Sequence, residues 1–291
     1  MLATDSPSLT RLCESPGAPA AGRLVVLLPE IGGGRQTDDT LRRLDAAPDA
    51  TELIISGLDQ RSFETVVRGH GARFRGIFFW KCPLVADLSP LEELPGLTHV
   101  AIYWNQRATC LWDLRRTPRL QGLQFEDFTR LHDLKVLAAA VALEELVFGD
   151  KVWDTSTFSS LDPIGQLRGL RRLRFTAKHI DDRRIQPVRD LQRLTELWFP
   201  AKLFSPRQLA WLRARLPESV QCESLAPFRR LPPDPQGWFR GRDVAVNGRD
   251  GRLLNSTLQA GRLARHVEAF ERCVAHYRRV PEEEPTEAPL A

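Results

Sequence analysis

The 291-residue sequence has few lysines and no long apolar run. Of its 41 basic residues, nearly all are arginine, and lysine occurs only at Lys81, Lys135, Lys151, Lys178 and Lys202. Heavy use of Ala, Arg, Pro and Leu is typical of a GC-rich genome, so we attribute the net charge of +4 to composition. No stretch approaches the roughly 18 apolar residues of a membrane span. We therefore expect no membrane partner.

Cysteine is also scarce. The five cysteines are Cys13, Cys82, Cys110, Cys222 and Cys273. They are widely separated and odd in number, which argues against a disulfide framework. The N-terminus lacks the basic segment followed by an apolar segment that is typical of a secretion signal. We therefore expect reduced thiols and a cytoplasmic location.

What the sequence does contain is a repeat of the form L-x-x-L-x-L. Its clearest copies are Leu120/Leu123/Phe125, Leu143/Leu146/Phe148, Leu170/Leu173/Phe175 and Leu194/Leu197/Phe199. The steps between middle residues are 23 to 27 residues, and these middle residues are Leu53, Ile77, Val100, Leu123, Leu146, Leu173 and Leu197. A recurring period of this size indicates a solenoid.

Apolar residues two apart place both side chains on one face of a strand. A single coil cannot bury that face, whereas stacked coils with parallel strands form a continuous core. The residues between them must point outward, onto the exposed face of the sheet. That outward face is where we expect binding residues.

The stretch from Val85 to Asn105, VADLSPLEELPGLTHVAIYWN, resembles the internalin-like leucine-rich repeat of bacterial proteins. Asn105 occupies the position whose side chain satisfies backbone groups at the turn, and Cys82 holds the equivalent place one coil earlier. The Asn is missing from most other coils, so this is a divergent, irregular member. The resemblance implies an α/β leucine-rich-repeat solenoid, with a curved parallel β-sheet on one face, short helices on the other, and N- and C-terminal caps.

We divide the chain into five segments. They are a flexible N-terminal segment (1–22), an N-terminal cap or zeroth repeat (23–50), about seven or eight leucine-rich repeats (51–225), a C-terminal hairpin with an amphipathic capping helix (226–279), and a disordered acidic tail (280–291). The apolar stripe of the terminal helix fits either docking on the stack or a dimer seam, and we expect a monomer. Extra residues in 151–160, including Trp153, form either a binding feature or a loop folded onto the stack.

Aromatic and charged residues gather in the outward columns of the predicted sheet. Neighbouring strands lie about 4.8 Å apart, which makes Phe78, Trp80 and Tyr103 neighbours. Aromatic anchors beside a charge are typical of a binding hot spot. The alternative is that these aromatics pack on one another or under a cap. The candidate partner-binding residues are Phe78, Trp80, Tyr103, Gln124, Glu126, Arg172, Arg174 and Trp198.

A catalytic site is not indicated. The histidines lack metal-ligand spacing, and no Ser or Cys lies in a nucleophile motif, so we assign no catalytic, cofactor or metal residues. We predict a non-enzymatic scaffold that binds an unidentified protein on the sheet face. One alternative is binding of a polyanion or nucleic acid through Arg172, Arg174, Arg183 and Arg184. Another is a dimeric structural module formed through the terminal helix.

Overall fold

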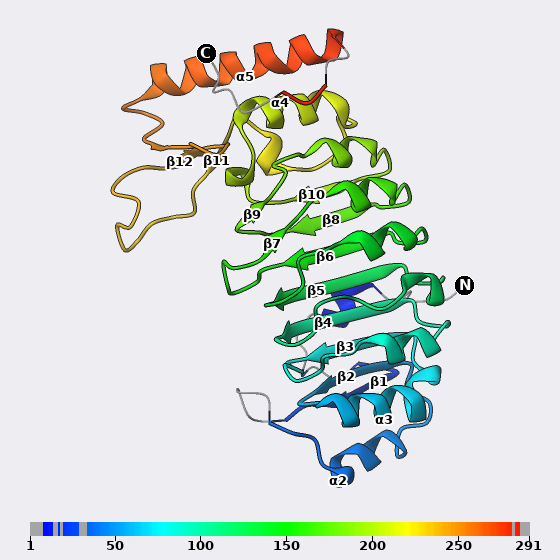
Figure 1. Cartoon of the computed structure of the whole chain (residues 1–291). Helices are drawn as coiled ribbons and strands as arrows, with labels where there is room; N and C mark the ends of the chain where they lie inside the picture. The colour runs from blue at the N-terminus through cyan, green and yellow to red at the C-terminus, as the bar shows by residue number, and fades with distance from the viewer. Residues whose placement is uncertain (1–7, 14–16, 18–19, 29–33, 281–282, 286–291) are drawn as a thin grey trace, which may run out of the picture.

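The structure, a computed structural model, describes residues 8–13, 17, 20–28, 34–280 and 283–285. Eight strands form one parallel sheet in chain order and stack along the length of the molecule (Figure 1). The strands are β1 (Arg23–Val26), β2 (Glu52–Ser56), β3 (Gly76–Trp80), β4 (His99–Asn105), β5 (Gly122–Phe128), β6 (Glu145–Gly149), β8 (Arg172–Phe175) and β10 (Glu196–Trp198).

The register of this sheet places the middle residues of the repeat side by side. The aligned residues are Leu53, Ile77, Val100, Leu123, Leu146, Leu173 and Leu197. Each coil therefore lays its strand beside the preceding one, as the period predicts. The predicted fold is confirmed: the chain is a leucine-rich-repeat solenoid.

The third apolar position of the repeat is phenylalanine in four consecutive coils. The ring centroids of Phe125, Phe148, Phe175 and Phe199 are separated by 5.5, 5.5 and 5.3 Å. Each ring is almost fully buried and packs on the same ring of the next coil. Each coil thus buries its apolar residues against its neighbours, as expected for a quasi-one-dimensional fold.

Short helices connect the strands, and most are 3₁₀ helices. Between β5 and β6 the helical segment is η5 (Lys135–Ala139), and before β10 it is η7 (Gln186–Asp190). A 3₁₀ helix rises about 2.0 Å per residue, whereas an α-helix rises about 1.5 Å. A 3₁₀ helix therefore spans the same distance with fewer residues, and the coil can be shorter. The helices of the stack are α2 (Asp38–Leu41), η1 (Arg42–Leu44), α3 (Gln60–His70), η2 (Gly71–Arg73), η3 (Ser89–Glu93), η4 (Leu114–Arg116), η5 (Lys135–Ala139), η6 (Asp162–Gln166), η7 (Gln186–Asp190), η8 (Ala201–Leu203), α4 (Pro206–Arg215) and η9 (Glu223–Leu225).

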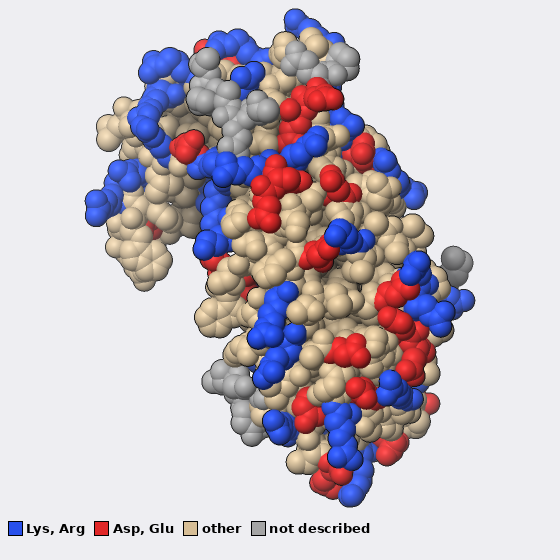
Figure 2. All heavy atoms as spheres, viewed as in Figure 1, with Lys and Arg blue, Asp and Glu red and all other residues tan. Residues whose placement is uncertain are grey.

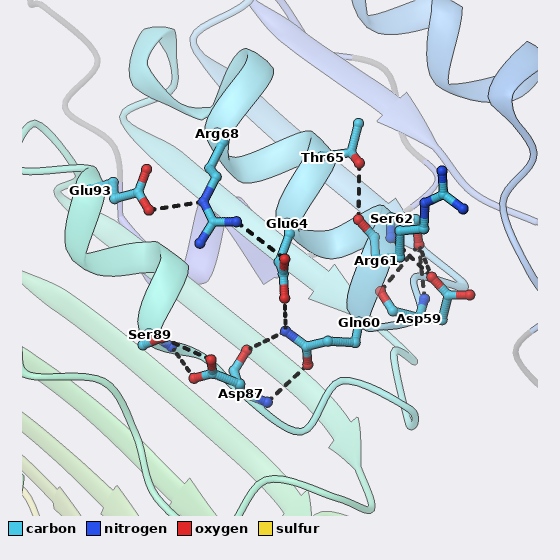
Figure 3. Close-up of polar contacts among 10 residues, drawn as sticks. All are labelled: Asp59, Gln60, Arg61, Ser62, Glu64, Thr65, Arg68, Asp87, Ser89 and Glu93. Carbon is cyan, nitrogen blue, oxygen red and sulfur yellow. Dashed lines mark hydrogen bonds and ion pairs between the residues drawn. The ribbon is translucent and has the colours of Figure 1, made fainter.

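Polar side chains join neighbouring coils. Acidic and basic residues are interspersed along the stack on the side shown in Figure 2. The amide oxygen of Gln60 at the start of α3 accepts the backbone N–H groups of Ala86 (3.0 Å) and Asp87 (2.9 Å) in the next coil, and the contact with Asp87 is drawn in Figure 3. Arg68 donates to Glu93 of that coil at 2.9 Å. These contacts add side-chain hydrogen bonds to the sheet ladder between coils.

The C-terminal end of the stack is closed by α5 (Ala260–Arg279), which packs along α4. Phe270 and Tyr277 on its apolar stripe are buried, and Arg215 of α4 donates to the Tyr277 carbonyl at 2.6 Å. The stripe therefore faces this chain's own stack. An antiparallel sheet precedes the helix and consists of β11 (Phe228–Arg230), β12 (Val244–Val246) and β13 (Leu253–Leu254).

The acidic tail, which we expected to be disordered, is attached to the stack at Glu284. Its carboxylate accepts the backbone N–H groups of Ile185 (2.9 Å) and Gln186 (2.8 Å), where η7 starts, and the side-chain amide of Gln208. The first N–H groups of a helix have no partner within the helix, which explains why a carboxylate is stabilised there. Residues 281–282 and 286–291 of the predicted tail lie outside the described residues.

Asn105 forms the turn contacts that the repeat resemblance implies. Its side-chain nitrogen donates to the carbonyl of Val85 at 2.8 Å, and its oxygen accepts the N–H groups of Arg107 (3.0 Å) and Ala108 (2.8 Å). The side chain is 1% exposed, so water cannot replace it. These backbone groups depend on Asn105 for their hydrogen bonds.

Replacing Asn105 with Ala should therefore destabilise the protein by about 2–4 kcal/mol, because several buried backbone groups lose their partner. The free energy of unfolding in urea measures this loss. Gln106→Ala is the matched control, since that neighbouring side chain is exposed. Equal stability of the two variants would show that the Asn105 contacts are not needed.

Candidate functional site

All eight candidate partner-binding residues lie on the face of the sheet turned away from the main core. The register joins Phe78 to Ala101, Trp80 to Tyr103, and Tyr103 to Glu126. Further along the stack, one column runs from Gln124 on β5 through Val147, Arg174 and Trp198. Arg172 lies in the adjacent column of β8. The structure therefore brings these residues onto one continuous surface.

This surface is divided by a short helix, α1 (Leu9–Cys13), which packs against β3, β4 and β5. It is the dark blue segment behind β4 and β5 in Figure 1. Leu12 is 1% exposed and packs in a second apolar cluster with Ile54 and Phe78. We expected residues 1–22 to be a flexible lead-in, and α1 differs from that expectation. The remaining described residues of this segment are 8, 17 and 20–22.

Polar contacts hold α1 in place. The guanidinium of Arg23 donates to the carbonyl of Arg11 at 2.6 Å and pairs with Glu52 at 3.0 Å. The backbone N–H of Leu9 donates to the carboxylate of Glu145 at 3.2 Å. The helix has only two leucines, and its own sequence does not predict docking. The signal that could have found it is the sheet itself, because large apolar residues such as Ile54 and Phe78 point outward and require cover.

The predicted aromatic patch makes most of its contacts within the protein. Phe78 is 1% exposed and Tyr103 is 8% exposed. Trp80 is half-buried, with its ring centroid 4.7 Å from that of Tyr103. The ammonium groups of Lys81 and Lys151 lie 5.4 Å and 5.2 Å from the rings of Trp80 and Tyr103. The structure thus places these aromatics beside α1, packed on one another.

The insertion at 151–160 forms the border of the same surface. Asp127 accepts the backbone N–H groups of Lys151 (2.8 Å) and Val152 (3.1 Å). Phe158 in β7 (Thr157–Phe158) packs on Phe148, and β7 pairs with β9 (His179–Ile180). Trp153 remains 48% exposed. The C-terminal part of the insertion therefore packs into the core through Phe158. Its N-terminal part places Lys151 at the outward face of the sheet.

Gln124 and Glu126 are buried at the edge of α1. The amide of Gln124 donates to Glu126 at 2.6 Å, and the Lys151 ammonium lies 4.0 Å from the same carboxylate. Burial raises the pKa of Glu126, and the positive charges of Lys151 and Arg174 oppose that rise. The two positive charges therefore do not fully offset the cost of burying the Glu126 carboxylate.

Beyond α1 the surface opens into a groove of about 550 Å³ over β5, β6, β8 and β10. Arg172 on its floor pairs with Glu145. The guanidinium of Arg174 stacks on the ring of Trp198, 4.7 Å from its centroid, and Trp198 is 41% exposed. No carboxylate among the described residues forms an ion pair with Arg174. The groove therefore presents an ordered cation and an aromatic ring to solvent.

The four arginines of the polyanion alternative lie at two places. Arg172 and Arg174 are on β8, whereas Arg183 and Arg184 follow β9. Arg184 donates to Gln186 and lies 3.9 Å from Glu284. At each place one arginine therefore lies close to a carboxylate: Arg172 to Glu145, and Arg184 to Glu284.

Metal-binding residues do not converge in the described part of the chain, where no three His, Cys, Asp or Glu side chains form a group that could hold an ion. His266 instead lies 3.0 Å from the carbonyl of Pro227, so it connects α5 to the chain before β11. No helix within the described ranges is long and apolar enough to cross a bilayer.

The comparisons with known proteins add little to this site. No protein-family model matches the sequence, and no curated protein matches it. Among solved structures, internalin C2 of Listeria monocytogenes is similar, with 21% sequence identity and a TM-score of 0.44. The match covers 60% of this chain and 71% of that chain.

Releasing α1 should expose Cys13, which borders the groove. Burial, with a further contribution from Glu126, raises the pKa of the Cys13 thiol to about 12. We expect Leu12→Asp to undock α1 and to speed maleimide labelling of Cys13 at pH 8 by at least roughly tenfold, because a larger fraction becomes thiolate. Site-resolved mass spectrometry measures the rate, with the exposed Cys110 as internal reference. Unchanged labelling of Cys13 would contradict the docking of α1.

The raised pKa of Glu126 predicts that its effect on stability depends on pH. A carboxyl group whose folded-state pKa is raised contributes stability below its ordinary pKa, and that contribution is lost as the pH rises through the folded value. Glu126→Gln should therefore be more stable than the wild type at pH 7, and this advantage should shrink toward pH 4. Urea unfolding at both pH values tests it. Greater stability of the wild type at pH 7 would mean that Lys151 and Arg174 outweigh the burial.

Proposed function

We propose that this protein binds another protein on the open part of its repeat sheet. The open face consists of Val147, Arg172, Arg174, Glu196 and Trp198, carried by β6, β8 and β10. The observation that carries the proposal is the stack of Arg174 on the exposed ring of Trp198. Solenoids of this kind present extended concave surfaces, and such surfaces are used for binding.

The Arg174–Trp198 pair has the chemistry of a binding hot spot. Trp and Arg are enriched among the residues that dominate interface energy. Stacking already orders the guanidinium, so less entropy is lost when it donates to a partner. Because α1 forms one wall of the groove, a bound segment would contact both the sheet and the helix. This favours a polypeptide that lies along the groove.

The covered aromatics take a different role in this proposal. Phe78 and Tyr103 are buried with Leu12, so they support α1. We propose that direct contacts to the partner come from the open face, with Gln124 and Glu126 at its border. The sequence pointed to partner-binding residues along the whole sheet, and this proposal restricts them to the coils that carry β6, β8 and β10.

Binding is favoured over catalysis by the state of the groove's reactive groups. Two cysteines, Cys13 and Cys222, line the groove. Burial raises the pKa of Cys13 to about 12 and that of Cys222 to about 11, so both thiols stay protonated and are weak nucleophiles near neutral pH. Arg172 is occupied by Glu145. These features support a binding role.

Affinity capture from the native cell tests this function with three baits: the wild type, the double variant Arg174→Glu with Trp198→Ala, and the control Val141→Ala. Val141 is 72% exposed and lies outside the open face. We expect a polypeptide that the wild type and the control capture equally and that the double variant binds roughly thirtyfold more weakly, the loss typical of a hot spot.

The captured polypeptide is then purified and its affinity for each bait is measured directly. Equal affinity for all three baits would contradict binding at the open face. All three substitutions are at exposed positions, so matching unfolding midpoints are expected and confirm that the double variant is folded.

A further inference from the structure

An excess of positive charge lies in the C-terminal cap, before the acidic tail. The C-terminal cap, defined here as residues 226–280, has eleven arginines, no lysine and five acidic residues, a net charge of +6. Residues 1–225 have a net charge of +2, and the tail 281–291 has four glutamates and a net charge of −4, which brings the complete chain to +4. Figure 2 shows basic side chains gathered at this end, over α5 and the segment around β11 and β12. An excess of this kind is not explained by composition, which affects the whole chain.

The cap also exposes apolar side chains. Trp238 is 76% exposed and Leu258 is 84% exposed, the highest values for large hydrophobic residues among those described. Trp238 lies in the segment between β11 and β12, which projects from the stack in Figure 1. Arg240 and Arg242 follow it, and both are exposed. The most exposed aromatic ring of the described chain is thus followed closely in sequence by two exposed arginines.

This projecting segment is ordered by its own hydrogen bonds. The carboxylate of Asp234 accepts the backbone N–H groups of Trp238 at 2.8 Å and Phe239 at 2.5 Å. The side chain of Asn255 donates to the carbonyl of Gly241 at 2.7 Å, which ties the segment to the turn that carries Leu258. The exposure of Trp238 is therefore built into the fold.

We propose that the C-terminal cap binds an anionic phospholipid surface. Trp is enriched at the membrane–water interface, where its ring enters the headgroup region and its N–H stays hydrated. Arginines near an anionic leaflet each strengthen the attraction. A nucleic acid would also attract Arg240 and Arg242 and stack on Trp238, but it offers no apolar environment for Leu258. The exposed leucine therefore favours a lipid surface.

This inference departs from the expectation of no membrane partner, which rested only on the absence of an apolar run long enough to span a bilayer. Peripheral binding needs only a few inserted side chains together with charge, whereas a span needs a long apolar helix. The open face is carried by β6, β8 and β10, outside the cap, so the two surfaces use different residues. The lipid proposal therefore does not depend on the proposed function.

Co-sedimentation of the full chain with large vesicles at 0.1 M salt tests the proposal. We expect binding to vesicles of phosphatidylcholine with 30% phosphatidylserine and not to phosphatidylcholine alone. Trp238→Ala should weaken binding roughly tenfold through lost burial of the ring. Arg240→Ala with Arg242→Ala should weaken it roughly fivefold for each arginine removed.

Trp153→Ala is the matched control, because this half-exposed tryptophan lies in the repeats, and it should bind vesicles as the wild type does. Failure of the wild type to bind phosphatidylserine vesicles would overturn the proposal. So would wild-type affinity in both cap variants. Binding of a single-stranded oligonucleotide instead of vesicles, with the same losses, would identify the ligand as nucleic acid and would also overturn it.

Discussion

The structure depends on the parallel register between coils. Residues two apart fill the core, and the residue between them must point outward, so a slip by one residue would exchange the two sets. The stacked rings of Phe125, Phe148, Phe175 and Phe199 favour this alignment, since each packs on its equivalent one coil away. Once the register is set, the outward columns are set as well. The binding surface is therefore a consequence of core packing.

One outward column explains where the surface is closed and where it is open. It is apolar at its beginning and mixed in its later part, and it reads Ile54, Phe78, Ala101, Gln124, Val147, Arg174 and Trp198. The apolar beginning cannot face water without cost, and Leu12 of α1 covers it. The later part carries the charge of Arg174, stacked on Trp198, and α1 does not cover it. The same sheet thus has a structural half and a half available to a partner.

The period of the sequence predicted the register and the outward columns, because both follow from the two-residue alternation of a strand. It did not predict α1, since two leucines in a five-residue helix form no pattern. Nor did it predict Glu284, whose role depends on backbone groups of η7 that are distant in sequence. Nor did it indicate a role for Asn247, which lies directly after β12. Its side chain donates to the carbonyls of Glu223 and Ala226, much as Asn105 does in the repeats.

The division of the sheet into a closed and an open half is the central claim. Hydroxyl-radical footprinting with residue-level mass spectrometry measures it directly, because the oxidation rate of an aromatic side chain follows its exposure to solvent. The structure predicts rapid oxidation of Trp198, which is 41% exposed, and protection of Phe78 and Tyr103. Oxidation of Phe78 and Tyr103 as rapid as that of Trp198 would show that α1 does not cover the sheet, and would contradict the claim.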